Sequence, residues 1–480
     1  MTVINTHKPI RGFLKKQIPL IITVLIGVGL WYCPRPEALT EVAWHVFAIF
    51  VATIVAIILK PLPMGAIAII ALAVTTVTGT LSINEALDSY NKAPIWLIVI
   101  AFFISKGFIK THLGLRIGYY FVMLFGKSSL GLAYSLTFSE LLLSPAIPSV
   151  TARTGGIIYP IAGGLAEAFN SKPNQPSARN LGTFLILVCF QGSVITSAMF
   201  LTAMATNPTV VVFAQDLGVN ISWNVWALGA LVPGLLSILV MPLVVYKLSA
   251  PTIKEIPDAY HLAKDKLKQM GKMKYQEWVM LGVFMLLIGL WIVGERIGID
   301  SVTTAILGVS VLLLMRVVNW SELLGETVAW ETFLWFGALL TLASQLKSKG
   351  VIDYFSEHMA GFVGGMEWVY GLLILSILYF FSHYFFASSM AHVGAMFSTF
   401  LLTSIALGAP PILSALLLAY FSSLYGGLTH YGIGSAPVLF GSGYVALREW
   451  WRVGLIVSIV NIFIWTVVGG IWWRVLGFWG

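Results

Sequence analysis

Long apolar runs separated by short polar loops recur along the chain, most of them close to the roughly 20 residues that a helix needs to cross a bilayer. Two further apolar stretches, 129–169 and 368–407, are broken near their centres. We therefore predict an all-α integral membrane protein with about eleven transmembrane helices and two re-entrant hairpins. The predicted spans are 17–33, 40–60, 63–82, 93–110, 182–206, 223–247, 276–294, 302–317, 330–347, 411–434 and 451–476.

The break in the first of these stretches covers residues 144–156, where two prolines, two glycines and several hydroxyl side chains surround Arg153. A charge at membrane depth costs about 2.5–3.5 kcal/mol even on lenient insertion scales. Irregular backbone is tolerated there only where protein or a water-filled cavity satisfies it. We expect this hairpin tip to present hydroxyls, free N–H groups and a fixed cation to an anion.

Basic residues are distributed unequally between the two membrane faces. One face carries the N-terminal segment and the polar loop 248–275, and the positive-inside rule places that face in the cytoplasm and the C-terminus outside. Its basic residues are Lys8, Arg11, Lys15, Lys16, Lys60, Lys106, Lys110, Arg116, Lys127, Lys172, Arg179, six lysines of the polar loop, Arg316, Arg448 and Arg452. The opposite face carries Arg35, Lys92, Arg296, Lys347, Lys349 and Arg474.

Composition agrees with this class, because 58% of the residues are hydrophobic and 10% are charged. The net charge of +8 follows from juxtamembrane lysines rather than from nucleic-acid binding. A regulatory or nucleic-acid patch in loop 248–275 is the alternative interpretation. Cys33 and Cys189 are far apart and beside or within apolar runs, so we predict neither a disulfide nor a metal site.

The chain also repeats itself. The segment 96–121 resembles the segment 332–355 in pattern and length, and a broken hairpin follows each at a matching distance. In the predicted topology the two copies have opposite orientations. Inverted repeats with discontinuous helices near the midplane are typical of secondary transporters.

The two hairpin tips can be aligned: the run Ser149–Arg153 (SVTAR) matches the run Ser388–His392 (SSMAH), with hydroxyls first and a basic residue last. Each hairpin is followed by an apolar run with an internal proline, at Pro208 and Pro437. Four paired discontinuities are expected to converge on one polar site. The candidate residues are Ser149, Val150, Thr151, Arg153, Thr206, Asn207, Ser388, Ser389, Met390, His392 and Ser435.

Over nearly its whole length the chain resembles the divalent anion:sodium symporter family, the INDY-like carboxylate transporters. Within it the chain is most similar to the branch of bacterial citrate, tartrate and succinate exchangers. The resemblance is carried by PSVTARTGG at 148–156 with Tyr159-Pro160, FASSMAH at 386–392, FGSGY at 440–444 and Trp450-Trp451, and it includes the lysine-rich central loop.

The resemblance implies an elevator-type homodimer in the cytoplasmic membrane, with lipid and small carboxylates as its partners. A static scaffold would contain 1–92 and 223–329, with the lysine-rich loop 248–275. A moving transport domain would contain 93–222 and 330–450, with the hairpins 129–169 and 368–407, and 451–480 would form a C-terminal helix. It implies substrates such as succinate, malate, fumarate, 2-oxoglutarate, tartrate or a tricarboxylate, bound between the tips.

The family's tips carry a Ser-Asn-Thr motif. Ser149-Val150-Thr151 and Ser388-Ser389-Met390 stand in those places here, so the asparagine is absent from both. In sodium-coupled members the tips are described as contributing oxygen ligands to Na⁺. A guanidinium beside such a site would repel sodium by several kcal/mol at an effective dielectric constant near 20. We therefore expect Arg153 and His392 to replace the coupling cations, with no cofactor and no sodium dependence.

A permanently bound charge cannot leave with the substrate, and moving it unpaired through a low-dielectric barrier is costly. An obligate exchanger is therefore expected.

Several alternatives remain: a structural Arg153 that snorkels or pairs with Glu140, a structural His392, and a sodium- or proton-coupled symporter. A membrane enzyme and a passive channel fit less well, because no catalytic constellation is visible and paired hairpins suggest occlusion. His383 and His430 are expected to pack among aromatic residues.

Overall fold

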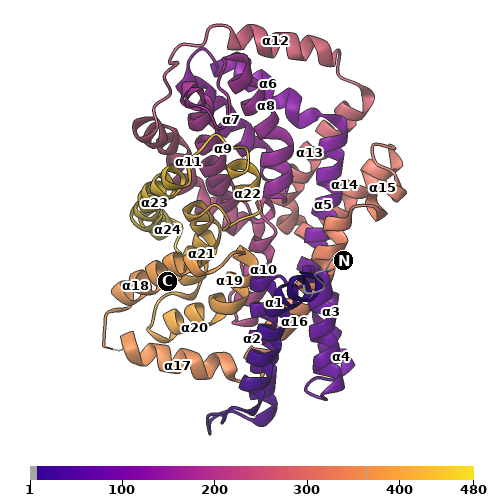
Figure 1. Ribbon diagram of the computed structural model, residues 1–480, viewed down its shortest axis with the longest axis vertical. Helices are drawn as coiled ribbons and strands as arrows, with labels where there is room; N and C mark the ends of the chain where they lie inside the picture. The colour runs from indigo at the N-terminus through magenta and orange to yellow at the C-terminus, as the bar shows by residue number, and fades with distance from the viewer. Residues whose placement is uncertain (1–7, 364, 480) are drawn as a thin grey trace, which may run out of the picture.

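The computed structural model describes residues 8–363 and 365–479, and it is built of helices (Figure 1). These residues contain no β-strand, and an isolated bridge joins Ser128 to Glu255. The predicted all-α membrane architecture is confirmed. Residues 1–7 of the predicted N-terminal group and residue 480 of the predicted C-terminal helix lie outside the described residues.

Each predicted span corresponds to a helix. Ten helical stretches among the described residues are long and apolar enough to cross a membrane, and two of these are the arms of the second hairpin. Three predicted spans, at 17–32, 64–77 and 301–314, form shorter apolar helices. The spanning helices are α1 (Lys8–Tyr32), α2 (Glu41–Leu59), α3 (Met64–Val77), α5 (Ala93–Thr111), α9 (Gly182–Met199), α11 (Trp223–Leu248), α13 (Tyr275–Val293), α14 (Ser301–Leu314), α16 (Thr327–Ser348), α21 (Pro411–Leu424), and α23 (Leu447–Phe463) continued by α24 (Gly469–Val475).

Both hairpins form, and their breaks lie where the prolines and hydroxyl residues predict them. The first hairpin consists of α7 (Ser129–Leu143), a non-helical tip, a π-helical segment Thr151–Ile158 and α8 (Tyr159–Ala168). The second consists of α18 (Trp368–Ser382), the short α19 (Ser389–His392), a π-helical segment Val393–Phe397 and α20 (Ser398–Ala406). A π-helical segment therefore follows each tip.

The two segments matched in the sequence share the same local order of elements. After α5, the left-handed residue His112 leads into the amphipathic helix α6 (Leu113–Phe125). After α16, the left-handed residue Gly350 leads into the amphipathic helix α17 (Val351–Val363). In each case a hairpin follows. The left-handed residue ends one helix and allows the next to start in a new direction.

Further helices were not evident from hydropathy. The loop 248–275, predicted simply as a polar loop, contains α12 (Ala259–Met270), which packs against α6. This helix is amphipathic, and the many lysines on its solvated face mean that it has no long apolar run by which hydropathy could identify it. The remaining short helices are α4 (Ile83–Leu87), α10 (Thr206–Asp216), α15 (Trp320–Leu324) and α22 (Ser435–Phe440).

Figure 1 shows α6, α8 and α12 at one end of the molecule, and α4 and α17 at the other. The loop after α1 lies at the end that carries α17. The lysine-rich helix α12 is thus at the opposite end from this loop. This arrangement is compatible with the orientation that the positive-inside rule predicts.

Packing divides the helices into two groups that differ from the predicted domains. α16 and α5, both predicted as part of the moving transport domain, pack against helices of the predicted scaffold, α16 against α2 and α3 and α5 against α13 and α14. α1, α2, α3 and α16 pack together, and α5 lies between α14 and α16. α11, predicted as scaffold, instead packs along α9, the hairpin arm α7 and the C-terminal helices α23 and α24. Its hydropathy could not show this, because every spanning helix is apolar whichever neighbour it contacts.

We expect the two cysteines to report the orientation of the chain. Cys33 is exposed in the loop after α1, and Cys189 is buried in α9. A membrane-impermeant maleimide added to intact cells should label the wild-type chain and not Cys33→Ser. In the Cys33→Ser background, Lys266→Cys on α12 should be labelled only after permeabilisation. The reverse labelling pattern would show that the chain has the opposite orientation in the membrane.

Helix α23 approaches backbone closely at one glycine. A Cβ at Gly454 would lie 2.5 Å from the Gly427 carbonyl oxygen and 3.0 Å from that of Leu428, whereas a Cβ at Gly289 in α13 would meet nothing within 4 Å. Gly454→Ala should lower the melting temperature in detergent by several degrees, because overpacking costs about 1–3 kcal/mol. Gly289→Ala should leave it unchanged or raise it slightly, since alanine favours the helix. An equal effect of both would contradict this packing.

Candidate functional site

A cavity of about 930 Å³ lies where both hairpin tips meet the two broken spans. The first tip contributes residues 148–152 and the second contributes residues 387–390. The break before α10 contributes residues 204–206, and the break before α22 contributes residues 432–434. The four discontinuities predicted from the sequence therefore line one space.

The structure brings seven of the eleven predicted site residues to the wall of this cavity and buries the other four behind it. The lining residues are Ser149, Val150, Thr151, Thr206, Ser388, Ser389 and Met390. The four residues behind the wall are Arg153, Asn207, His392 and Ser435, each with 0% exposure. The cavity wall at the tips is therefore made of hydroxyls and apolar groups rather than of charges.

The leading serines have the same role in both tips. The Ser149 side-chain oxygen accepts from the backbone N–H of Ala152 at 3.1 Å, and that of Ser388 accepts from Ala391 at 3.4 Å. Both serines thus cap the helical arm that follows. Because the serine oxygen accepts in this bond, each hydroxyl proton remains available for an anion in the cavity.

The neighbouring residues of the second tip are less available. The Ser389 hydroxyl donates to the carbonyl oxygen of Gly432 at 3.2 Å. The Met390 sulfur accepts from the Thr209 hydroxyl at 3.2 Å. The second tip is therefore bonded to the broken span that follows it and to α10, and its leading hydroxyl, that of Ser388, is the one left for a ligand.

Arg153 is enclosed by oxygen atoms. Its Nε donates to a carboxylate oxygen of Glu140 at 2.6 Å, and one terminal nitrogen donates to the Ile147 carbonyl and, at 2.9 Å, to the Ala203 carbonyl. The other terminal nitrogen donates to the Ser197 hydroxyl at 3.1 Å. We call this set of oxygens, from Glu140, Ile147, Ala203 and Ser197, the oxygen cage. It joins α7, the first tip, α9 and the break that follows α9.

Two predictions about Arg153 are corrected by this geometry. It does not reach the cavity in this conformation, because its guanidinium is fully buried and directed at the cage. Its charge is also matched by the carboxylate of Glu140. The alternative left open by the sequence, in which Arg153 pairs with Glu140, is the arrangement observed.

His392 lies behind the second tip among aromatic rings. Its ring stacks on Tyr379 and Phe386, each with a centroid distance of 4.6 Å, and its Nε2 lies 2.9 Å from the Ser382 hydroxyl. His383 stacks on Tyr425 at 3.8 Å. His392 was predicted as a substrate-binding residue, but in this conformation it is fully buried and does not line the cavity. His383 packs among aromatics as predicted, and so does His430.

Asn207 stabilises the first broken span. Its amide donates to the carbonyls of Ser197 and Phe200 at 2.8 and 2.9 Å, and its side-chain oxygen accepts from the Ser423 hydroxyl at 3.0 Å. These carbonyls lie at the end of α9, where helical partners are lost. The amide also links the two broken spans, since Ser423 belongs to α21. Asn207 is therefore a structural residue in this conformation.

The opposite wall of the cavity was not predicted as part of the site. It comes from the α2–α3 loop, the end of α5 and the start of α16, and its charged members are Lys60, Lys106 and Glu326. Lys106 and Glu326 form an ion pair at 3.2 Å. Both lysines entered the sequence interpretation only as topology markers, and nothing in their local sequence separates them from other juxtamembrane lysines.

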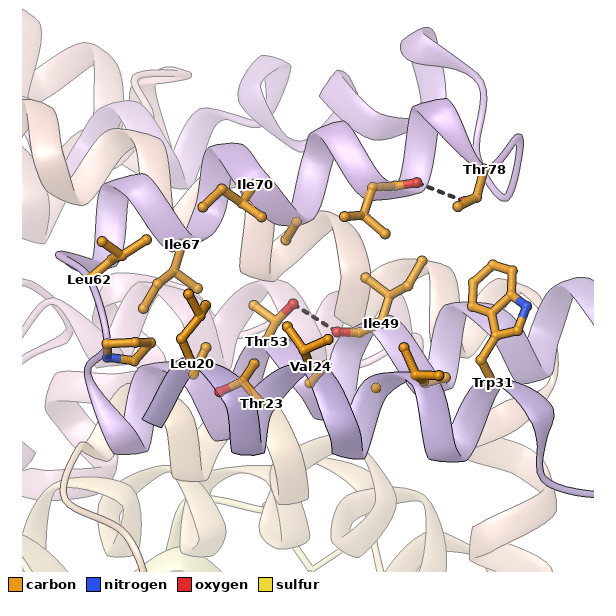
Figure 2. Close-up of a pocket in the computed structure, with 18 of the residues that line it drawn as sticks. Leu20, Thr23, Val24, Trp31, Ile49, Thr53, Leu62, Ile67, Ile70 and Thr78 are labelled. Atoms are coloured by element: carbon orange, nitrogen blue, oxygen red, sulfur yellow. Dashed lines mark hydrogen bonds between the residues drawn. The ribbon is translucent and has the colours of Figure 1, made fainter. Parts of the chain in front are cut away.

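A second cavity, of about 360 Å³, lies among α1, α2 and α3 (Figure 2). Its lining is almost entirely apolar, and the hydroxyls of Thr23, Thr53 and Thr78 donate to carbonyls of their own helices. Figure 2 shows two of these bonds, from Thr53 and Thr78. The larger cavity instead has hydroxyls from both hairpin tips on its wall, so the cavity between the tips is the candidate site for an anion.

Comparison with known proteins agrees with this architecture. The family described as "Sodium:sulfate symporter transmembrane region" matches residues 14–479. The chain is 54% identical to the "Putative malate transporter YflS" of Bacillus subtilis, over 97% of each chain. It is 51% identical to the chloroplastic "Dicarboxylate transporter 1" of Spinacia oleracea, over 96% of this chain and 82% of that protein.

Among solved structures, the Alcanivorax borkumensis YdaH transporter, whose topology is described as unusual, has a similar fold. The TM-score is 0.59 at 14% identity, and the match covers 98% of this chain and 99% of that one. The family match covers nearly the entire chain, and the relatives are transporters. The chain therefore belongs to the sodium:sulfate symporter family, and it is a multi-pass membrane transporter rather than an enzyme.

Proposed function

We propose that this protein exchanges dicarboxylates, of the succinate, malate, fumarate, 2-oxoglutarate or tartrate class, across the cytoplasmic membrane without sodium. Its family and its similarity to malate and dicarboxylate transporters support dicarboxylate transport. The observation that carries the finer proposal is the Arg153 guanidinium in the oxygen cage.

The description of the family names sodium as a transported ion. Sodium requires oxygen ligands, and carbonyls freed at helix breaks are suitable ones. In this chain the carbonyls of Ile147 and Ala203 and the Ser197 hydroxyl already accept from Arg153. A sodium ion there would lose these ligands and meet a guanidinium at close range. The residues present do not fit sodium at this tip.

The reason for exchange differs from the one that the sequence suggested. Because Glu140 neutralises Arg153, moving the empty carrier does not require moving a bare charge. What remains is that the cation in the cage is covalently attached and cannot be released. With no ion to couple, accumulation of one dicarboxylate needs the outward movement of another.

The cavity itself supports a dicarboxylate as the ligand. Ser149 and Ser388 hydroxyls from the two tips can each donate to a carboxylate group. The same two serines cap the arms that follow them, so backbone N–H groups at positive helix ends lie close by. Two donors on opposite tips suit a molecule with a carboxylate at each end.

We further propose an elevator mechanism in a homodimer. The hairpins pack with α9, α11 and α21, and the C-terminal helices pack with α9 and α11, while α1, α2, α3 and α16 pack with one another. The cavity lies between these groups, as expected if one group carries the substrate past the other. The homodimer rests on the family resemblance alone.

We expect uptake of labelled succinate, malate or 2-oxoglutarate into proteoliposomes to require unlabelled dicarboxylate inside. In potassium buffer, loaded vesicles should accumulate label and empty ones should not, and sodium should change neither result. Uptake into empty vesicles that rises with a sodium or proton gradient would instead identify a coupled symporter. Uptake into empty vesicles without any gradient would indicate a uniporter.

Arg153→Ala should open the oxygen cage to sodium. The variant should lose sodium-independent exchange, and its melting temperature should fall in potassium chloride by several degrees, since an unpaired buried partner costs about 3–5 kcal/mol. Sodium chloride should restore part of that loss. The control is Arg116→Ala, which breaks a buried pair with Glu277 away from both tips and should respond equally to both salts. Equal behaviour of the two variants would contradict the cage interpretation.

A further inference from the structure

Lys60 has an unusual place in the cavity. It follows α2 directly, and its backbone N–H bonds to the Ala56 carbonyl at 2.8 Å. Its backbone is left-handed, with φ 51° and ψ 52°. Glycine is the usual residue at such helix ends because a Cβ disfavours this conformation. Arg316 has the same backbone conformation, with φ 53°, so the turn gives Lys60 no special role by itself, and its position in the cavity is what distinguishes it.

The charges around the cavity single out the same residue. Of the lining residues, Lys60, Lys106 and Glu326 are charged, and Lys106 is paired with Glu326 at 3.2 Å. Lys60 is exposed and forms no ion pair among the described residues. The tips supply no charge to the cavity, since Arg153 is buried against Glu140. Lys60 is thus the unmatched charge that a dianion entering this cavity would meet.

Lys60 also belongs to the group of helices that does not contain the hairpins. It lies between α2 and α3, which pack with α1 and α16. In the proposed elevator this group stays in place while the tips move. A cation fixed there can act on the substrate at one membrane face and not at the other.

We propose that Lys60 is a positioning residue that captures the dicarboxylate at the cytoplasmic mouth of the cavity and stays behind when the tips carry it across. This inference rests on the proposed dicarboxylate transport and on the predicted orientation. It implies that the two faces of the carrier recognise the same substrate with different electrostatics.

The test uses right-side-out and inside-out membrane vesicles of cells that express the full chain. Both are loaded with saturating unlabelled succinate, and KM and maximal rate are measured for labelled succinate outside. The main variant is Lys60→Asn, because asparagine is neutral and tolerates the left-handed backbone. Lys60→Arg keeps the charge.

A matched control is Arg316→Asn. Arg316 is also basic, exposed and left-handed, with φ 53°, and it lies on the same predicted face but outside the cavity. If Lys60 captures substrate, Lys60→Asn should raise KM in inside-out vesicles by about five- to tenfold at low salt, the size expected for one exposed cation acting on a dianion. The maximal rate should stay within about twofold, and KM in right-side-out vesicles should not rise.

The increase should shrink near 1 M salt, where the Debye length is about 3 Å. Arg316→Asn and Lys60→Arg should behave like wild type. An unchanged KM for Lys60→Asn, an equal rise at both faces, or a fall in maximal rate alone would overturn the inference while leaving dicarboxylate exchange intact. A wild-type chain that exchanges no dicarboxylate would instead overturn the proposed function.

Discussion

The rest of the candidate site depends on the bonds between Arg153 and the oxygen cage. A hairpin tip and a broken helix both leave carbonyls without helical partners, and such groups cannot remain unpaired at membrane depth. One guanidinium satisfies carbonyls from both and is itself neutralised by Glu140. The bonds therefore tie α7, the tip and α9 into one unit, and they let an irregular backbone reach the cavity with its carbonyls paired.

The second tip reaches a similar shape by different means. Its basic residue is a histidine stacked between Tyr379 and Phe386, and its carbonyl contacts are made by hydroxyls, such as Ser389 to Gly432. The serine caps are nevertheless alike in both tips. Among the described residues, the tip side of the cavity consequently has no charged side chain and is rich in hydroxyls, whereas the unpaired cation Lys60 lies on the opposite wall. In the proposed mechanism, hydrogen bonds from the tips would hold a dianion during transit, and the charge of Lys60 would attract it at entry.

Much of this was predictable because bilayers impose strong rules on sequences. The spans, the two hairpins and the convergence of Ser149, Thr151, Thr206 and Ser388 follow from apolar length, from prolines that break helices, and from hydroxyls placed at those breaks. The direction of Arg153 did not follow. Its alignment with His392 suggested that both residues face the substrate. A long side chain at a helix break can point either into the cavity or into the protein interior, however, and a sequence alignment does not determine its rotamer.

The sequence by itself determined the membrane class, the order of the helices, the positions of the four breaks and the residue types at both tips, because these depend on local composition and on the length of apolar runs. Only the tertiary structure decided which charges face the cavity. Arg153 pairs with Glu140, Asn207 bonds to Ser423, and Lys60 faces the cavity. Each of these placements involves more than one element of the structure. Which elements become neighbours depends on how the apolar helices pack. The sequence does not reveal this packing, because the apolar surfaces of different helices have similar residues.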